Sequence, residues 1–306
     1  MENNTQYDEE IDLRELFGAL WVGKIQIIAI TAIFAFASVM YALSSPDVYK
    51  ATVVLSPAQS DSSDLSGALG QLGGLASFAG VNIGGSGGGE AEMAYEIMQS
   101  WSFIENFITD NDLAVELFAV EGWNKDSNQL LINDEAYDVE NDQWLIENEV
   151  GTKGPPRSWI LYLAFVGLLD ISEDKDTGMV SVSIEYYSPY IAKQLVDLYI
   201  ESINSFMQQR QVDKVTRNIT YLEQQIGKTS IAEMQEVFYN IIEEQIKTKM
   251  LAEASPDFAF TSVSPSMVPD QKIKPNRALI CILGTMFGGI FSVLFVLVMH
   301  YFRKRS

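Results

Sequence analysis

Two residue types that enzyme active sites often use are nearly missing from this chain. Its 306 residues include one histidine and one cysteine. His300 and Cys281 both fall in or at the edge of one apolar run near the C-terminus. No Ser/His or His/Cys cluster can therefore be assembled, and a cysteine pair for a disulfide is absent. We predict no catalytic residue, no cofactor site and no metal site, and the chain is not expected to be an enzyme.

Basic residues are also scarce. The chain has 20 Lys and Arg against 41 Asp and Glu, which gives a formal net charge of −21. Such a surface repels polyanions, so nucleic acid and anionic lipid are excluded as partners. The glycine-rich stretch from Asp61 to Glu90 lacks the lysine and hydroxyl residue that must follow the glycines of a phosphate-binding loop.

What the sequence does contain is a long uncharged run from Ala278 to Tyr301, which we extend to a predicted transmembrane helix over residues 278–302. As a helix, this run of 24 residues covers about 36 Å, against about 30 Å for the hydrocarbon core of a bilayer. Gly284, Gly288 and Gly289 lie within it, and the first two fall on one helical face. This spacing predicts a close approach of another helix, although glycine is also simply common in membrane helices.

A second apolar run, Ile25 to Leu43, supplies a partner helix of spanning length. The alternative is a cleaved signal peptide. We disfavour that alternative because the preceding residues, 1–24, are acidic and the run is longer than usual for a signal peptide. Within residues 1–24, the pattern Asp12-Leu13-Arg14-Glu15 and a spaced apolar face predict an amphipathic helix.

A proline-basic motif precedes the second apolar run: Pro269, Lys272, Pro275 and Arg277. Proline disfavours helix at the residue before it, so we expect the helix to begin no earlier than Asn276. The basic tail, residues 303–306, is expected to stay inside the cell, which places both termini in the cytoplasm and residues 44–277 outside.

The outer region reads as an α+β domain. Strands are predicted at Val48–Leu55, Leu168–Ser172, Met179–Glu185 and Phe258–Val263, and helices at Glu90–Phe118 and from Ser158 to about Val166. Leucines at helical spacing within the glycine-rich stretch predict a short helix or packed loop near Leu65–Phe78, followed by a mobile stretch, Gly84–Gly89. The acidic stretch 121–150 is interpreted as solvated surface; a calcium loop would need glycine where Gln143 stands.

A long helical hairpin is predicted at about residues 190–253. Ser188-Pro189 is typical of a helix start, and Gly227 and the Ser230–Glu233 capping box mark the turn. A heptad spacing predicts a narrow seam against a second helix. Its members are Val212, Val215, Ile219, Leu222 and Ile226.

The order of these segments resembles the chain-length determinant (Wzz) family, the polysaccharide co-polymerases of bacterial inner membranes. The resemblance rests on the following pieces: EIDLRELFGALW, VYKATVVLSP, QLGGLASFAG, GMVSVSIEYYSPYIAKQLV, IIEEQIKTKMLAEASPDFAF and VPDQKIKPNRALICILGTMFGG. Related proteins with a cytoplasmic tyrosine kinase differ, because only residues 303–306 follow the second run here. The resemblance thus implies a co-polymerase without a kinase domain.

That resemblance implies an inner-membrane protein whose mixed helix and sheet domain lies in the periplasm, and which assembles into a closed homo-oligomeric ring. It implies a non-catalytic regulator of the chain length of an O-antigen type polysaccharide. The implied partners are the polysaccharide polymerase and the lipid-linked polysaccharide. The alternatives are a membrane-anchored sensor, which would need a signalling module that the short tails leave no room for, and an envelope adaptor for polysaccharide export.

Overall fold

The structure is a computed structural model that describes residues 20–58, 88–147 and 151–305. Contacts divide the chain into two compact units. One comprises the residues up to Asp47 together with those from Lys272 onward, and the other is Val48–Gln271. The predicted helix around residues 12–21 lies almost wholly outside the described residues, and the predicted element at 65–78 lies entirely outside them.

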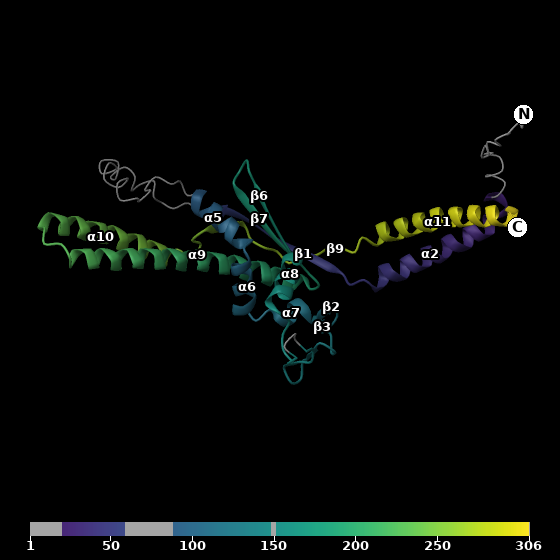
Figure 1. Ribbon diagram of the computed structural model, residues 1–306, viewed down its shortest axis with the longest axis horizontal. Coiled ribbons are helices and arrows are strands. Elements are labelled where there is room, and N and C mark those ends of the chain that lie inside the picture. Colours follow the sequence, from purple (N-terminus) through teal and green to yellow (C-terminus); the bar gives the residue numbers. More distant parts are fainter. Residues whose placement is uncertain (1–19, 59–87, 148–150, 306) are drawn as a thin grey trace, which may run out of the picture. The chain divides into compact units, whose positions relative to one another are not determined.

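The first unit is a pair of apolar helices. Helix α2, Lys24–Ser44, and helix α11, Arg277–Arg305, lie side by side, and the short strand β9, Lys272–Lys274, precedes α11 (Figure 1). Both helices are long and apolar enough to cross a membrane. Most large apolar side chains along them are exposed, among them Ile25, Phe36, Ile282 and Phe287 at 62 to 74 %. Exposure of this kind suits contact with lipid rather than water.

The second unit is built on an antiparallel sheet with the strand order β6-β7-β1-β8. Its strands are β1 Val48–Pro57, β6 Leu169–Asp174, β7 Met179–Tyr186 and β8 Phe260–Ser264. In the central pair, Ala51 lies opposite Ile184, Val53 opposite Val182 and Leu55 opposite Val180. All six side chains are buried, because alternate residues of a strand point to the same face. The predicted mixture of helix and sheet is confirmed.

The stretch from Glu90 to Phe118, predicted to be helical, is divided by two breaks that the pattern did not indicate. Three helices occupy this stretch: α5 Gly88–Met98, α6 Trp101–Asp110 and α7 Ala114–Phe118. Ser100 caps the start of α6, because its side chain accepts a hydrogen bond from the Phe103 amide at 3.4 Å. Asp112, between α6 and α7, has a left-handed backbone (φ 51°), which separates these two helices. Gly88 and Gly89, predicted to be mobile, are the first residues of α5.

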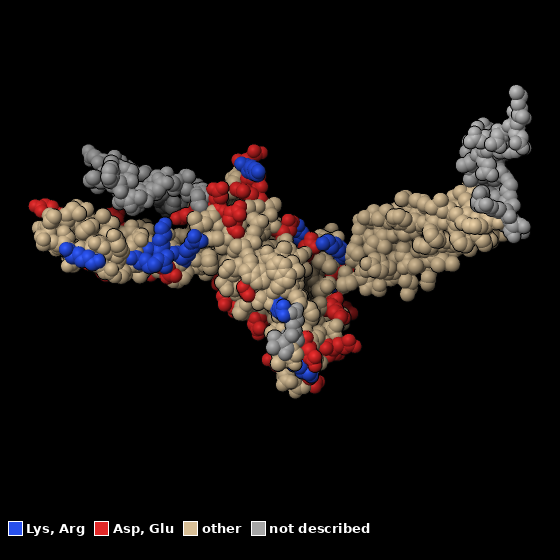
Figure 2. All heavy atoms as spheres, in the orientation of Figure 1, with Lys and Arg blue, Asp and Glu red and all other residues tan. Residues whose placement is uncertain are grey.

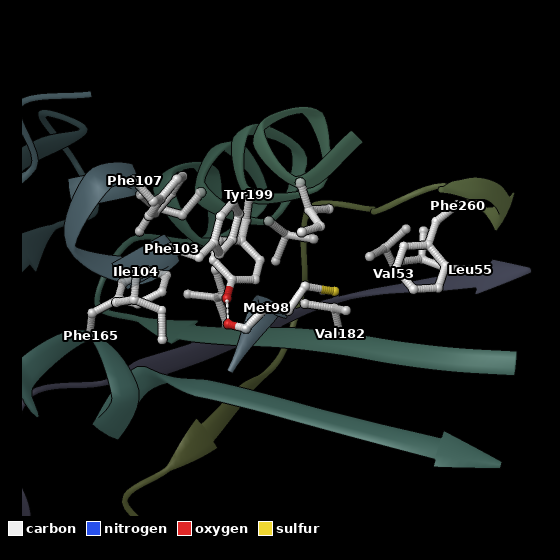
Figure 3. Packing of buried hydrophobic residues seen from close by; sticks show 14 of the residues in the cluster. Val53, Leu55, Met98, Phe103, Ile104, Phe107, Phe165, Val182, Tyr199 and Phe260 are labelled. Atoms are coloured by element: carbon white, nitrogen blue, oxygen red, sulfur yellow. Dashed lines mark hydrogen bonds between the residues drawn. The ribbon is translucent and has the colours of Figure 1, made fainter. Parts of the chain in front are cut away.

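The core lies between the sheet and the helices α5, α6, α8 (Ser158–Leu168) and α9 (Pro189–Ile226). Figure 3 shows Phe103, Ile104, Phe107, Phe165 and Tyr199 converging above β7. Rings of Phe107 and Tyr199 meet edge to face with centroids 5.0 Å apart, a favourable aromatic geometry. The Tyr199 hydroxyl donates to the Met98 carbonyl oxygen, which satisfies the one polar atom that this ring buries.

The acidic stretch contains strands that the sequence patterns did not predict. Strands β2 Val120–Asn124 and β3 Gln129–Ile132 form one small hairpin, and β4 Tyr137–Asp138 and β5 Gln143–Trp144 form another. Asn128 and Asp142 take positive φ values of 53° at their turns, which asparagine and aspartate tolerate better than most residues.

Helices α9 and α10 (Ala232–Ala254) form an antiparallel hairpin, which we call the arm (Figure 1). Helix α9 has 38 residues, so it is about 57 Å long at 1.5 Å per residue. Ser230 does not cap α10 as predicted: the N-cap residue is Ile231, which makes no side-chain cap bond. The predicted long helix is confirmed.

Candidate membrane and assembly surfaces

Two of the three predicted motif glycines lie against the partner helix. A Cβ added at Gly284 would overlap the Cβ of Ser38, and one added at Gly288 would lie 2.5 Å from the Cβ of Phe34. Even an alanine at either position would therefore force the helices apart. Close backbone approach through small residues is how apolar helices gain van der Waals contact in a membrane.

Gly289 differs from these two. A Cβ added there meets no atom within 4 Å. Because Gly289 is one residue from Gly288, it points about 100° around the helix and away from α2. Among the three motif glycines, Gly284 and Gly288 form the contact strip and Gly289 stands beside it.

Further contacts extend the strip toward the other end of the pair. The hydroxyl oxygens of Thr31 and Ser292 lie 3.3 Å apart, and the rings of Phe34 and Phe291 have centroids 5.8 Å apart. Ser292 is completely buried, and its hydroxyl also donates to the Gly289 carbonyl oxygen at 2.7 Å. The pair thus contains an interhelical polar contact as well as the glycine strip, and both are typical of membrane helix packing.

The proline-basic motif is divided between the two units. Pro269 is half-buried in the Val48–Gln271 unit, whereas Lys272, Pro275 and Arg277 belong to the unit of the helix pair. The Asn276 side chain accepts a hydrogen bond from the Leu279 amide at 3.2 Å, which caps α11. The helix begins at Arg277, within the bound that Pro275 sets.

The two basic side chains of this motif meet one carboxylate. Asp47 Oδ1 accepts from Lys272 Nζ at 2.7 Å and from Arg277 Nη2 at 2.9 Å. Arg277 Nε also donates to the Ala42 carbonyl oxygen at 3.1 Å, near the C-terminal end of α2. We call this group the Asp47 clasp. It joins the end of α2 to the beginning of α11.

The predicted seam residues occupy one face of α9. Val215 is 2 % exposed, and the other four, Val212, Ile219, Leu222 and Ile226, are half-buried. The positions of α10 that are not fully exposed include a run with the same spacing: Gln235, Phe238, Ile242, Gln245, Lys249 and Ala252. Gln208 Nε2 donates to the Ala252 carbonyl oxygen at 2.9 Å near one end of the arm, and Gln235 Nε2 donates to the Thr229 carbonyl oxygen at 2.9 Å near the other.

Titratable groups in the described part of the chain form no constellation suited to chemistry. No group of three or more His, Cys, Asp or Glu residues there is arranged to hold a metal ion. Burial raises the pKa of the Tyr186 and Tyr199 hydroxyls, and a hydrogen bond to Asp142 raises the pKa of Tyr137 to about 12. In the acidic stretch, Asp138 accepts from the side chain of Asn141 and from two backbone amides, which lowers its pKa. Such bonds stabilise a turn.

Burial also raises the pKa of Glu116. Its Oε2 is buried and is the one such side-chain atom in the described residues without a hydrogen-bond partner. The Tyr186 hydroxyl donates to the Glu116 backbone carbonyl rather than to this carboxyl group.

These surfaces define a class of protein: a mixed helix and sheet domain with a helical arm, which lies in the sequence between two apolar helices that pack through small residues. Within that class, residues 9–111 match the model of a family described as "Chain length determinant protein" (Wzz). This match confirms the resemblance drawn from the sequence. A search of curated proteins found no match.

Two solved structures are similar. One is a "full-length bacterial polysaccharide co-polymerase", 15 % identical, covering 96 % of this chain and 99 % of its own, with a TM-score of 0.47. The other is a fragment of WzzB, a polysaccharide co-polymerase from Salmonella Typhimurium, 14 % identical, covering 75 % of this chain and all of the fragment, with a TM-score of 0.32. Because both TM-scores lie below 0.5, the description of the architecture rests on the helices and strands of this chain alone.

Sequence reasoning missed the residues that face the motifs. Ser38 and Phe34 lie four residues apart on α2, as Gly284 and Gly288 do on α11, so this common spacing was an available signal. Asp47 carried a weaker signal: it is the one acidic residue between the first apolar run and strand β1.

Proposed function

We propose that this chain regulates polysaccharide chain length as a co-polymerase of the bacterial inner membrane, without making or breaking bonds itself. The match of residues 9–111 to the chain length determinant family carries the proposal. It is supported by two candidate spans at the ends of the described chain and by the domain between them. The proposed localisation has both termini in the cytoplasm and Val48–Gln271 in the periplasm.

The proposed partners are further copies of the chain in a closed ring, the polysaccharide polymerase, and its lipid-linked product of O-antigen type. In this proposal Gly284 and Gly288 bring the spans together, the Asp47 clasp ties their outer ends, and the arm seam holds α9 against α10. Each of these contacts fixes the position of one part of a subunit. Polysaccharide chain length, the quantity that is regulated, depends in this proposal on the assembled ring.

The deciding experiment is deletion of the gene and electrophoresis of the surface polysaccharide. We expect the deletion strain to lose a preferred polysaccharide length and a plasmid copy to restore it. An unchanged length distribution would contradict the proposal. Counting subunits of the detergent-purified protein adds a second test: a closed ring supports the co-polymerase, whereas a monomer or simple dimer favours the sensor alternative.

A further inference from the structure

A shallow groove lies on the outer face of α9, near the N-terminal end of this helix. It has a volume of about 300 Å³ and is open to solvent. The opposite face of the helix, which includes Leu195, Tyr199 and Ile203, is buried against the sheet. Six side chains line the groove, and their spacing places them on one helical face: Tyr190, Lys193, Gln194, Asp197, Leu198 and Glu201. We call this feature the α9 groove, and it runs about 16 Å along the helix.

An aromatic ring lies at one end of the α9 groove. Tyr190 is 53 % exposed, and its ring meets that of Trp123 with centroids 6.3 Å apart. Trp123 in turn meets Tyr49 edge to face at 5.8 Å, and its indole Nε1 donates to Asn128 Oδ1 at 3.0 Å. Tyr190 is therefore an exposed ring whose position is supported by a row of aromatic neighbours. A ligand that packs against a supported ring loses less affinity to side-chain ordering.

Polar groups occupy the rest of the α9 groove. Lys193 Nζ pairs with Asp197 Oδ2 at 2.5 Å, and Asp197 Oδ1 accepts a hydrogen bond from the buried Ser266. Among the described residues, the side chains of Gln194 and Glu201 make no hydrogen bond or ion pair. Two groove residues are thus held by partners within the protein, and two are available to a ligand.

This combination of groups suits the chemistry of a sugar. A pyranose ring has apolar C–H faces, which pack on aromatic rings, and hydroxyl groups, which both donate and accept hydrogen bonds. The Gln194 amide supplies donors and an acceptor, and the Glu201 carboxylate supplies acceptors. A site for a small molecule encloses most of its ligand, whereas the α9 groove is open and elongated. It therefore fits a segment within a glycan chain.

Charge indicates which glycans fit. Within the α9 groove the charges of Lys193 and Asp197 cancel, which leaves the negative charge of Glu201. Figure 2 shows Lys and Arg gathered along the arm, while Asp and Glu surround the sheet on which this part of α9 packs. Such surroundings repel an acidic glycan and do not repel a neutral one.

We propose that the α9 groove binds a segment of a neutral polysaccharide. One pyranose face would pack on the Tyr190 ring, and neighbouring hydroxyls would bond to Gln194 and Glu201. The inference rests on the proposed function, in which a polysaccharide is a partner, and it names a surface where that partner touches the chain. Binding is noncovalent, and the length of the glycan remains a property of the assembly.

The test measures glycan binding by the full-length protein in mild detergent. The probe is the surface polysaccharide of the source organism, freed from its lipid by mild acid, and polygalacturonate serves as an acidic glycan. Binding is read as retardation in native gels that contain increasing concentrations of either glycan. The variants are Tyr190→Ala, Tyr190→Phe and the double substitution Gln194→Ala with Glu201→Ala. The matched control is Tyr221→Ala, because Tyr221 is a 62 % exposed tyrosine of the same helix outside the groove. Native mass measurement gives the subunit count of each protein.

We expect the surface polysaccharide to retard the unmodified protein and Tyr221→Ala equally, and polygalacturonate to retard neither. Tyr190→Ala should bind about tenfold more weakly because the packing surface is lost, whereas Tyr190→Phe, which keeps the ring, should stay within about threefold of the unmodified protein. The double variant should also bind about tenfold more weakly, since two hydrogen-bonding groups are removed. The subunit count should be the same in all of them.

Four results would overturn the inference: no retardation of the unmodified protein, undiminished retardation of Tyr190→Ala, equal loss of binding in Tyr221→Ala, or equal retardation by polygalacturonate. A lower subunit count in Tyr190→Ala with undiminished binding would assign the groove to a contact between copies of the chain instead. The gene deletion separates this inference from the proposed function. A deletion strain that loses its preferred length, while the purified protein does not bind the glycan, contradicts the groove alone, whereas an unchanged length distribution contradicts the proposed function.

Discussion

Asn204 shows how a single side chain holds the arm helix to the sheet. It is 4 % exposed on α9, and its Nδ2 donates to the Phe260 carbonyl oxygen at 2.9 Å. Its Oδ1 accepts from the amides of Ala259 and Phe260, each at 2.9 Å. These backbone groups lie at the start of β8, where Phe260 lies opposite Pro57 of β1, a residue without an amide hydrogen to donate. One amide side chain therefore satisfies three buried polar groups.

Replacing Asn204 with alanine should destabilise the protein by about 3 kcal/mol, because buried backbone groups left without partners each cost about 1–3 kcal/mol. Thermal unfolding in detergent would measure the loss. A matched control is Asn218→Ala on the same helix, where an exposed amide makes one 3.4 Å bond. Equal effects of the two substitutions would show that the Asn204 bonds add little.

Glu116 leads to a prediction about pH. Burial raises its pKa in the folded protein, so the folded state binds a proton more tightly than the unfolded state does. The folded protein therefore loses stability as pH rises above the ordinary value of 4.5 and through the raised pKa. Glu116→Gln should raise the melting temperature at neutral pH and flatten its dependence on pH above 4.5. The exposed Asp110→Asn variant serves as a control, and an unaltered slope in Glu116→Gln would exclude this account.

At the scale of elements, the helix pair depends on two positions of α11 and not on a third. Leucine at Gly284 and Gly288 should separate α11 from α2, because the added side chains would overlap Ser38 and Phe34. Leucine at Gly289 should have little effect, since nothing lies within 4 Å of its added Cβ. The readout is disulfide formation between Thr31→Cys and Ser292→Cys in a background with Cys281→Ser. Equal crosslinking in the cysteine background, in the variant with leucine at Gly284 and Gly288, and in the variant with leucine at Gly289 would show that the two glycines do not determine how the helices pack.

The arm seam allows a graded prediction. Aspartate at Val215, which is 2 % exposed, should cost several kcal/mol because it buries a charge without a partner. At the half-buried Ile219 the same change should cost less, and at the exposed neighbour Thr216 it should cost about 0.5 kcal/mol or less. Melting temperature and proteolysis between α9 and α10 would report the order. An Ile219→Asp protein that melts and assembles normally would place the seam elsewhere.

Helices and strands with a clear hydrophobic periodicity could be predicted from the sequence. Helix ends and short hairpins, which depend on a few side chains, could not. The alternation of Val180, Val182 and Ile184 predicts β7, and the absence of proline between Pro189 and Pro256 predicts a long helix. The break at Ser100 was missed because apolar residues continue at helical spacing across it, so the period carried no sign of the cap. The short hairpins near Tyr137 were missed because strands of two residues have no period to read.

At the scale of the whole molecule, the sequence pattern identified Gly284 and Gly288 but not what they touch. A glycine pair predicts that some helix approaches, whereas its partner atoms, Ser38 and Phe34, depend on the register of two helices far apart in the chain. The same holds for the Asp47 clasp. Lys272 and Arg277 stood out as basic residues among prolines, but their shared carboxylate lies 225 or more residues away.

The last prediction is that length control belongs to the assembly and that no single polar side chain performs it. Of the described residues, none combines a raised or lowered pKa with a nucleophile or metal-ligand cluster, and the shifts present have local structural causes such as burial and turn bonds. Substitutions that change polysaccharide length should therefore map to subunit contacts and the arm, act in graded steps, and alter the oligomer in parallel. An alanine scan of every Asp, Glu, Ser and Tyr from Ser44 to Arg277, scored by polysaccharide gel and by subunit count, measures both quantities. One substitution that abolishes the preferred length while the oligomer stays intact would identify a discrete chemical site and refute a purely architectural mechanism.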